Sequence, residues 1–293
     1  MGVNFPRIRS GLCALFELAF VSFSLQSVTR SHMNPTVRAA LTLVATSLPD
    51  WLLVFLCLFF GLVFLLPLLA SRKLRENYFV FFYQFVEVTW ADVLAKARRT
   101  ALTVLDELES HDPELRKQGA LRLLEIGAGT GANFKHIKRP LKYTNVDPTR
   151  GFASLFQEEL KRHPHIEMER WVQAYGEDMR ELDDDQFDVV LLTYIFCSVA
   201  DRLKVLMEAK RVLVKGGRVI FLEHVAHPKG TWKRLLQDVV NPLWKVATCN
   251  CHINRDCPQV LMQSVGFSNV NWDYMLLDMP VLLSLHAHGD AVA

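Results

Sequence analysis

The chain has 293 residues, and 33 Lys and Arg stand against 31 Asp and Glu, which leaves a formal net charge of +2. Charges so closely balanced produce no strong field that would gather a polyanion, so nucleic acid is excluded as the expected partner. Hydrophobic residues make up 51% of the chain, and their excess lies before Arg72. This distribution points to a membrane segment joined to a folded domain.

Residues 1–50 are predicted to be an N-terminal extension that is either a targeting region or disordered. A weak apolar stretch at 12–28 follows Arg7 and Arg9, as in the basic start of a signal peptide, but Glu17 and several serines interrupt it. It fits a targeting segment, a second membrane contact or poorly structured sequence. Translation from Met33 would remove it.

Residues 51–70 predict a membrane anchor helix, because these 20 positions contain no Asp, Glu, Lys, Arg or His. A helix of this length spans about 30 Å, the thickness of the hydrocarbon core of a bilayer. Arg72, Lys73 and Arg75 follow at once, and this basic flank favours a cytosolic position for the domain that comes next. A spanning helix, a monotopic hairpin and a helix embedded in a lipid droplet all remain open.

Residues 71–119 are predicted to be a helical connection. Aromatic side chains crowd positions 78–90 among few charges, which suits either a helix at the membrane interface or a helix packed on the domain. Asp112-Pro113 and Gly119 carry the turn chemistry that ends this connection. The folded domain is therefore expected at 120–293.

The domain alternates between apolar strands and helices, which is the pattern of βαβ units in a parallel sheet. Runs such as VVLL and VIFL indicate strands buried on both faces. Strands are predicted at 121–126, 143–146, 166–172, 187–192, 218–223, 268–274 and 281–292, and helices from about Ala132 and at 152–162, 201–213, 231–246 and 255–265, the last stopped by Gly266.

Three glycines, Gly127, Gly129 and Gly131, follow the first strand, where glycine allows a ligand to approach the backbone closely. Their spacing is GxGxG rather than the GxGxxG of dinucleotide folds. Glu125 beside the loop suits a cationic ligand without phosphates, since a carboxylate repels pyrophosphate. S-adenosylmethionine, with its positive sulfonium and amino groups, is such a ligand. The alternative is that the glycines serve only a tight turn.

Four polar residues at strand ends are further cofactor candidates. Asp147 ends the second strand, where its carboxylate can accept both ribose hydroxyls, although an Asp before proline also starts turns. Glu177 and Asp178 follow the third strand and fit either the edge of adenine or an acidic first helical turn. Thr193 leaves the fourth strand at the sheet edge where ligands of open α/β folds bind.

Six motifs carry a resemblance to class I methyltransferases, and more narrowly they are similar to the alkyl thiol S-methyltransferases of the endoplasmic reticulum and lipid droplets. The motifs are LLEIGAGTGANF at 123–134, VDP at 146–148, YGEDM at 175–179, FDVVLLTYIFCSV at 187–199, RVLVKGGRVIFLEHV at 211–225 and TWKRLLQDVVNPLW at 231–244. The resemblance covers about 72–272. Its weakest points are the long extension before the anchor, Asp178 in place of the common Asn, and the ending HAHGDAVA.

The resemblance implies an α/β, Rossmann-like class I methyltransferase fold with a seven-stranded, mostly parallel sheet in the order 3-2-1-4-5-7-6. It implies S-adenosylmethionine as cofactor, a small lipophilic thiol as methyl acceptor and a location at the endoplasmic reticulum membrane or lipid droplet, in contact with membrane lipid. It carries over as cofactor-binding residues Glu125, Gly127, Gly129, Gly131, Asp147, Glu177 and Asp178.

Competing functions remain open. A lipid, quinone or phenol acceptor is the first alternative. A nicotinamide-dependent oxidoreductase is disfavoured by the glycine spacing, and a membrane-tethered binding protein without turnover would keep the same motifs.

His224, just after the fifth strand, is the candidate for orienting or deprotonating the acceptor, against a polar strand-end residue without a catalytic part. The six cysteines do not form a disulfide pattern, which favours a reducing compartment. Cys249, Cys251, His252 and Cys257 lack a paired CxxC spacing, so no metal is expected.

Overall fold

The computed structural model describes Leu52 and residues 69–293. The chain divides after Leu53 into two units, and the fold described below belongs to the second, Val54–Ala293. The predicted extension at 1–50 and nearly all of the predicted anchor at 51–70 lie outside the described residues. Within the described part of the chain, no helix combines the length and apolar character needed to cross a bilayer.

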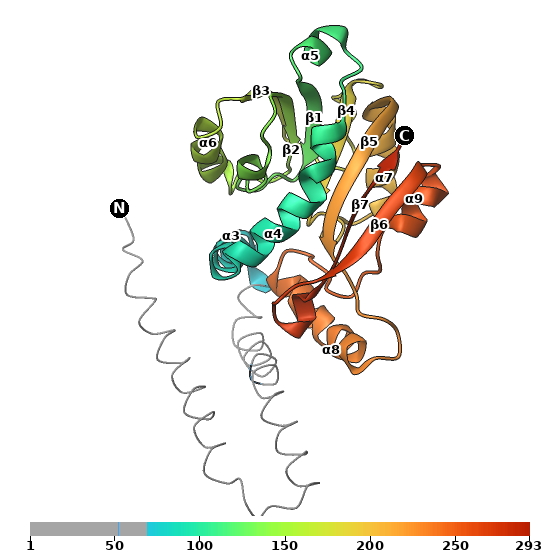
Figure 1. Ribbon diagram of the computed structural model, residues 1–293. Coiled ribbons are helices and arrows are strands. Elements are labelled where there is room, and N and C mark those ends of the chain that lie inside the picture. Colours follow the sequence, from blue (N-terminus) through green and yellow to red (C-terminus); the bar gives the residue numbers. More distant parts are fainter. Residues whose placement is uncertain (1–51, 53–68) are drawn as a thin grey trace, which may run out of the picture. The chain divides into compact units, whose positions relative to one another are not determined.

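Seven strands form one sheet in the order β3-β2-β1-β4-β5-β7-β6 (Figure 1). Strands β1 to β5 pair in parallel, whereas β7 runs antiparallel to both β5 and β6. The predicted strand order and the mostly parallel sheet are confirmed. The strands are β1 Leu121–Ile126, β2 Leu141–Val146, β3 Ile166–Val172, β4 Phe187–Thr193, β5 Leu213–His224, β6 Ser268–Leu276 and β7 Leu285–Val292.

Helices pack on both faces of the sheet because the central strands are apolar on both sides. Side chains alternate along a strand, so Leu123 and Leu191 join one buried cluster and Leu124 and Leu192 join the other. The helices are α3 Arg72–Thr89, α4 Ala91–Leu102, α5 Pro113–Lys117, α6 Ala153–Lys161, α7 Arg202–Val212, α8 Trp232–Ala247 and α9 Gln259–Val265, with 3₁₀ turns η1 Thr103–Glu107, η2 Phe134–His136 and η3 Val281–Leu283.

Helices α7 and α9 supply Val205, Leu206 and Met262 to one cluster, while η1 and α6 supply Leu105 and Phe156 to the other. The sheet is therefore the middle of three layers. Helix α9 stops at Gly266, whose φ of 85° gives the left-handed cap that the sequence predicts.

The predicted helix from about Ala132 is wrong. Only the 3₁₀ turn η2 forms between the glycine loop and β2. Gly131 has a φ of 77°, which no α-helix contains, and Pro140 disfavours helical geometry at the residue before it. Too few residues remain between these two points for a regular helix.

Candidate active site

A cleft of about 1320 Å³ lies at the carboxyl ends of β1, β2, β3 and β4, the edge where open α/β sheets bind ligands. Five of the sequence-predicted residues line it: Gly127, Gly129, Asp147, Glu177 and Thr193. Helix α3 contributes Phe79, Val80, Tyr83 and other side chains as the facing wall. The remaining predicted residues, Glu125, Gly131, Asp178 and His224, do not line this cleft.

The glycine loop requires glycine for two different reasons. Gly127, Gly129 and Gly131 have φ values of 71°, 56° and 77°, in the left-handed region that side chains disfavour. At Gly127 a Cβ would also lie 2.2 Å from Cδ1 of Ile195, a residue of the cleft wall. At Gly129 the nearest atom would be 3.9 Å away, so the loop backbone stays open toward a ligand.

Glu125 lies beneath the glycine loop and is fully buried, with both carboxylate oxygens occupied by the protein. The Tyr143 hydroxyl donates to Oε2 at 2.6 Å, and the Asn133 amide donates to Oε1 at 2.7 Å. Burial raises the pKa of Glu125, while these two hydrogen bonds oppose that shift. The geometry thus makes Glu125 a support of the loop rather than part of the cleft surface.

Asn133 is a site residue that the sequence analysis did not single out. Its amide also donates to the Thr193 hydroxyl at 2.6 Å, so it joins the end of β4 to Glu125 near the end of β1. Asn133 stands two positions after the last glycine, in a segment wrongly predicted as helix. Nothing in the sequence indicates that its side chain points back toward the sheet.

Asp147 follows β2 and places its carboxylate beside the glycine loop. The amides of Thr149, at 2.8 Å, and of Gly129 donate to it. Burial raises the pKa of Asp147 despite these two donors. Two lone-pair positions remain for a ligand, because a carboxylate accepts about four hydrogen bonds.

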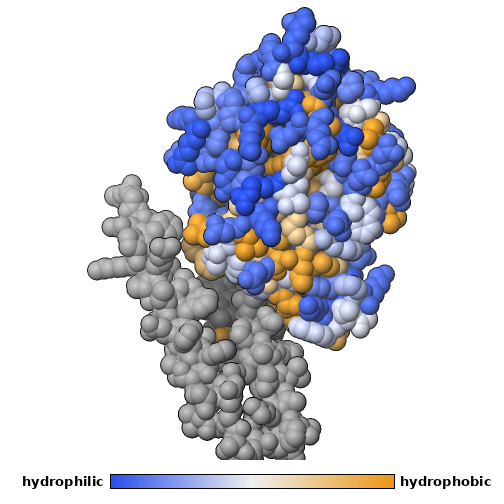
Figure 2. All heavy atoms as spheres, in the orientation of Figure 1, coloured by the Kyte–Doolittle hydropathy of each residue, from blue (hydrophilic) through white to orange (hydrophobic). Residues whose placement is uncertain are grey.

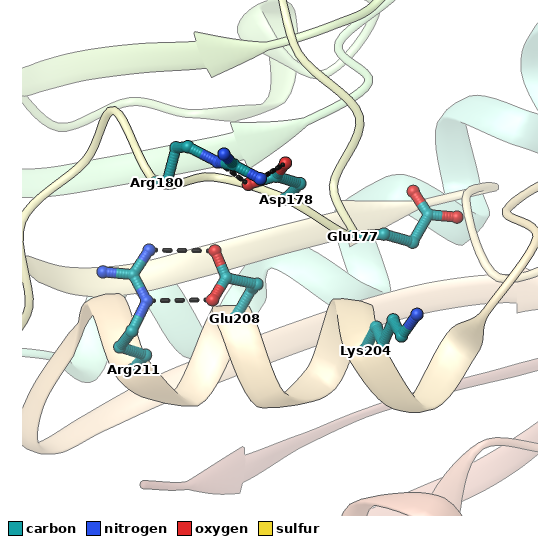
Figure 3. A pocket seen from close by; sticks show the side chains of 6 residues that line it. All are labelled: Glu177, Asp178, Arg180, Lys204, Glu208 and Arg211. Carbon is teal, nitrogen blue, oxygen red and sulfur yellow. Dashed lines mark hydrogen bonds and ion pairs between the residues drawn. The ribbon is translucent and has the colours of Figure 1, made fainter.

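Glu177 and Asp178 are neighbours in sequence, but only Asp178 pairs with Arg180, and Glu177 points away from that pair (Figure 3). Glu177 accepts hydrogen bonds from the amides of Ala200, at 2.8 Å, and Asp201, at 3.3 Å, and lines the cleft. Asp178 pairs with Arg180 at 2.6 Å in a surface pocket that Glu177 also lines, and this contact lowers the pKa of Asp178. The structure therefore places Glu177 at the cleft and Asp178 outside it.

Behind the facing wall of the cleft lies a partly buried ion pair that the sequence did not indicate. The Arg98 guanidinium of α4 donates to the Glu87 carboxylate of α3 at 3.0 Å, and it lies 5.6 Å from the centre of the Tyr194 ring. Tyr83 of α3 packs edge-on against Phe152. The predicted packing of this aromatic helix on the domain is seen, while the alternative of a helix at the membrane interface stays a prediction, because Phe81 and Phe85 of α3 remain exposed.

His224 ends β5 behind this wall. Its Nε2 lies 3.2 Å from Sγ of Cys251, and its ring stacks on Tyr194 with centroids 6.3 Å apart. Burial opposes a charge on His224, but the Cys251 thiol raises the pKa of the imidazole overall. A hydrogen bond with Cys197 lowers the pKa of Cys251 well below its usual range. Cys197, which the sequence analysis did not connect with these residues, completes the group.

Comparisons with known proteins agree with this arrangement. The family model described as a methyltransferase domain matches residues 124–221. Thiol S-methyltransferase TMT1A of Homo sapiens is 31% identical over 74% of this chain and 86% of its own length. Thiol S-methyltransferase TMT1B of Rattus norvegicus is 42% identical over 46% of this chain, which spans 55% of that protein's length.

A crystal structure from Thermotoga maritima, described as an S-adenosylmethionine-dependent methyltransferase and possible histamine N-methyltransferase, superposes with a TM-score of 0.51 at 20% identity. It covers 73% of this chain and 98% of its own. At this level of identity the likeness concerns the fold. The extensive match to TMT1A carries the assignment further, and the chain belongs to the family of S-adenosylmethionine-dependent methyltransferases that contains TMT1A and TMT1B.

Proposed function

We propose that this chain is a membrane-anchored methyltransferase that transfers the methyl group of S-adenosylmethionine to small lipophilic thiols. The match to TMT1A, named a thiol S-methyltransferase, over 86% of that protein's length carries the proposal. The cleft at the strand ends supports it, because that edge of the sheet is where cofactors of such folds bind.

The proposed cofactor contacts are the residues that line the cleft. The open backbone at Gly129 admits the cofactor, and the missing side chain at Gly127 leaves room for Ile195 of the cleft wall. Asp147 offers its remaining lone pairs to the ribose hydroxyls, and Glu177 and Thr193 line other parts of the cleft. Glu125 and Gly131 do not line the cleft, and their proposed role is to maintain the conformation of the glycine loop. Asp178 is left out of the contact set because it lies in another pocket.

Methyl transfer needs alignment more than acid–base power, and positioning alone contributes roughly 7–11 kcal/mol in favourable cases. S-adenosylmethionine, when bound, supplies a methyl group on a positively charged sulfur. Tyr83, Tyr194 and Ile195 line the cleft, and we propose that they shield the transferred methyl group from water. A thiol acceptor has a pKa of about 8.5 in water and already yields some thiolate at neutral pH.

His224 is proposed to orient the acceptor through Tyr194, on which its ring stacks and which lines the cleft. For His224 to take the proton itself, the acceptor would have to reach behind the wall to the buried Nδ1 atom, which has no partner among the described residues. Replacement by Asn tests this role. If His224→Asn leaves both turnover and its pH profile unchanged, His224 takes no part in the reaction.

The membrane part of the proposal rests on the 20 uncharged residues at 51–70 and on apolar side chains exposed in the described domain. Figure 2 shows apolar side chains interrupting the polar surface at the end of the domain where Figure 1 places α8. We propose the cytosolic side of the endoplasmic reticulum membrane or a lipid droplet as the location, where membrane lipid would concentrate lipophilic acceptors.

An assay of the detergent-solubilised full chain with methyl-labelled S-adenosylmethionine tests the function. A panel of lipophilic thiols, phenols and quinones of similar size should give labelled product with the thiols. Product with phenols or quinones alone would reassign the acceptor. Calorimetric binding of NADH without binding of S-adenosylmethionine would overturn the enzyme class, and cofactor binding without any product would indicate a binding protein.

A further inference from the structure

Three soft metal ligands meet behind the cleft wall. Cys197, His224 and Cys251 are 3%, 8% and 8% exposed, and their ligand atoms all lie within 4.8 Å of one another. They come from the loop after β4, the end of β5 and the turn after α8. The fold brings them together, so no sequence spacing could have shown the group.

The spacing of these atoms fits a tetrahedral zinc ion. Zinc bonds of about 2.3 Å to sulfur and about 2.0 Å to nitrogen hold neighbouring ligand atoms roughly 3.5 to 3.8 Å apart. The Nε2 atom of His224 lies 3.2 Å from Sγ of Cys251, and the limit of 4.8 Å bounds the other separations. The pair of His224 with Cys251 needs an adjustment of a few tenths of an ångström to admit the ion, and the other two separations need at most about 1 Å.

The segments that carry the ligands are already fixed to one another. The His252 amide donates to the Cys197 carbonyl at 2.8 Å, and the Asn250 side chain donates to the Ser198 carbonyl at 2.7 Å. These contacts hold the two cysteine backbones in place on either side of the site. A preorganised ligand set of this kind binds metal without a large ordering cost.

The three side chains form a buried set of soft ligands. Two thiols and an imidazole lie in an interior shielded from water, and Nε2 of His224 is already directed at Sγ of Cys251. Thiolate and imidazole are the preferred ligands of Zn²⁺. Binding through Nε2 leaves Nδ1 of His224, which has no partner among the described residues, available for a hydrogen bond on the side away from the ion.

We propose that Cys197, His224 and Cys251 bind one Zn²⁺ ion. The ion connects the loop after β4 to the turn after α8. The site adjoins the cleft, because Ser198, next to Cys197, and Asn250, next to Cys251, both line the cleft. Three protein ligands leave a fourth coordination position for water or another small ligand. Zinc bound at Nε2 also bars that nitrogen from accepting a proton, so the ion limits the part His224 can play in catalysis.

Metal content tests the site without any assay of methyl transfer. The full chain, expressed with added Zn²⁺ and purified in detergent without chelator, should contain about one zinc per chain by mass spectrometry of the metal. Substitutions Cys197→Ser, Cys251→Ser and His224→Asn should each lower that content severalfold. Cys257→Ser is the matched control, because Cys257 is equally buried, at 7% exposed, but stands outside the group.

Cobalt reconstitution of the wild-type chain gives an independent measurement, because it does not depend on the folding of any variant. Co²⁺ at this site should show tetrahedral d–d bands and sulfur-to-metal charge transfer. Background zinc in the wild-type chain together with an octahedral cobalt spectrum would overturn the proposal. A Cys197–Cys251 disulfide in the protein purified without oxidant, or unchanged zinc content in the three ligand variants, would do the same.

Discussion

The side-chain amide of Asn133 lies 2.7 Å from the carboxylate of Glu125 and 2.6 Å from the hydroxyl of Thr193. One nitrogen thus connects the ends of two central strands, β1 and β4, on the side where the cleft opens. Because Glu125 is fully buried, it depends on this amide and on Tyr143 for its hydrogen bonds. The shape of the glycine loop therefore depends on a residue that never touches the cleft.

Replacing Asn133 by Ala should lower both stability and cofactor affinity. The change leaves one oxygen of a buried carboxylate without its donor, which costs about 1–3 kcal/mol in the free energy of unfolding. It also releases Thr193, so the affinity for S-adenosylmethionine should fall. Denaturant unfolding and calorimetry measure the two effects. The exposed Asn271 replaced by Ala is the control, and equal results for both variants would contradict the bridging role of Asn133.

The sequence predicted the sheet well because strand burial is a local signal. The runs at 121–126 and 166–172 became β1 and β3 with the predicted bounds, and the apolar run VVLL became the fully buried centre of β4. The helix predicted after Gly131 was wrong. The stretch has apolar residues at helical spacing, but the left-handed backbone at Gly131 and the proline at 140 leave too few residues between them for a helix.

The site was only partly predictable for a different reason. Asp147 and Thr193 reach the cleft because strand ends of a parallel sheet meet at one edge, which topology alone determines. The wall formed by α3 and the pair of Arg98 with Glu87 depend on how a helix outside the βαβ pattern packs. The periodicity of the sequence does not indicate which surface of the domain α3 packs against.

Comparing Gly127→Ala with a control glycine should distinguish the cost of backbone strain from the effect of an added side chain on cofactor binding. Gly119 has a similar φ of 65° with nothing within 4 Å of an added Cβ, so Gly119→Ala is the matched control. Both substitutions should cost about 1–2 kcal/mol in the free energy of unfolding from the left-handed backbone. Only Gly127→Ala should weaken binding of S-adenosylmethionine, because the new methyl group pushes Ile195 into the cleft. Equal cofactor affinities of the two variants by calorimetry would refute this.

Asp147 should make cofactor affinity and stability respond to pH in opposite directions. Burial raises the pKa of Asp147, so its carboxylate protonates at a higher pH than an ordinary Asp, and affinity for S-adenosylmethionine should fall as pH drops through that value. Since the folded-state pKa is raised, the stability contribution of this group is full below the unfolded pKa and is lost as pH rises through the folded one.

The substitution Asp147→Asn isolates this group. It should weaken cofactor binding roughly 10- to 100-fold at neutral pH, the effect of losing hydrogen bonds to a charged acceptor. It should also remove the acid-side loss of affinity while leaving the domain as stable or more stable at neutral pH. The exposed Asp183→Asn is the control for both titrations. A wild-type pH profile of binding in Asp147→Asn would exclude Asp147 as the titrating group.

The exposed face of α8 should control access of membrane-borne acceptors. Trp232, Leu235 and Val239 are 57%, 65% and 60% exposed and share one helical face at spacings of three and four residues. Insertion of such side chains into a lipid surface stabilises the contact by roughly 1.5–3 kcal/mol each. The double substitution Leu235→Glu with Val239→Glu should therefore reduce turnover of a lipophilic thiol supplied in vesicles, through a higher KM.

The same double variant should turn over a water-soluble thiol at the wild-type rate, because its changed side chains face away from the cleft and the core. Val260→Glu on α9, where Val260 is 63% exposed, is the matched control for adding a charge to an apolar helical position. A reduction that is equal for soluble and vesicle-borne thiols would mean that α8 acts through folding. If neither substrate is affected, lipid reaches the cleft by another face, and α3, whose Phe81 is also exposed, is the next surface to change.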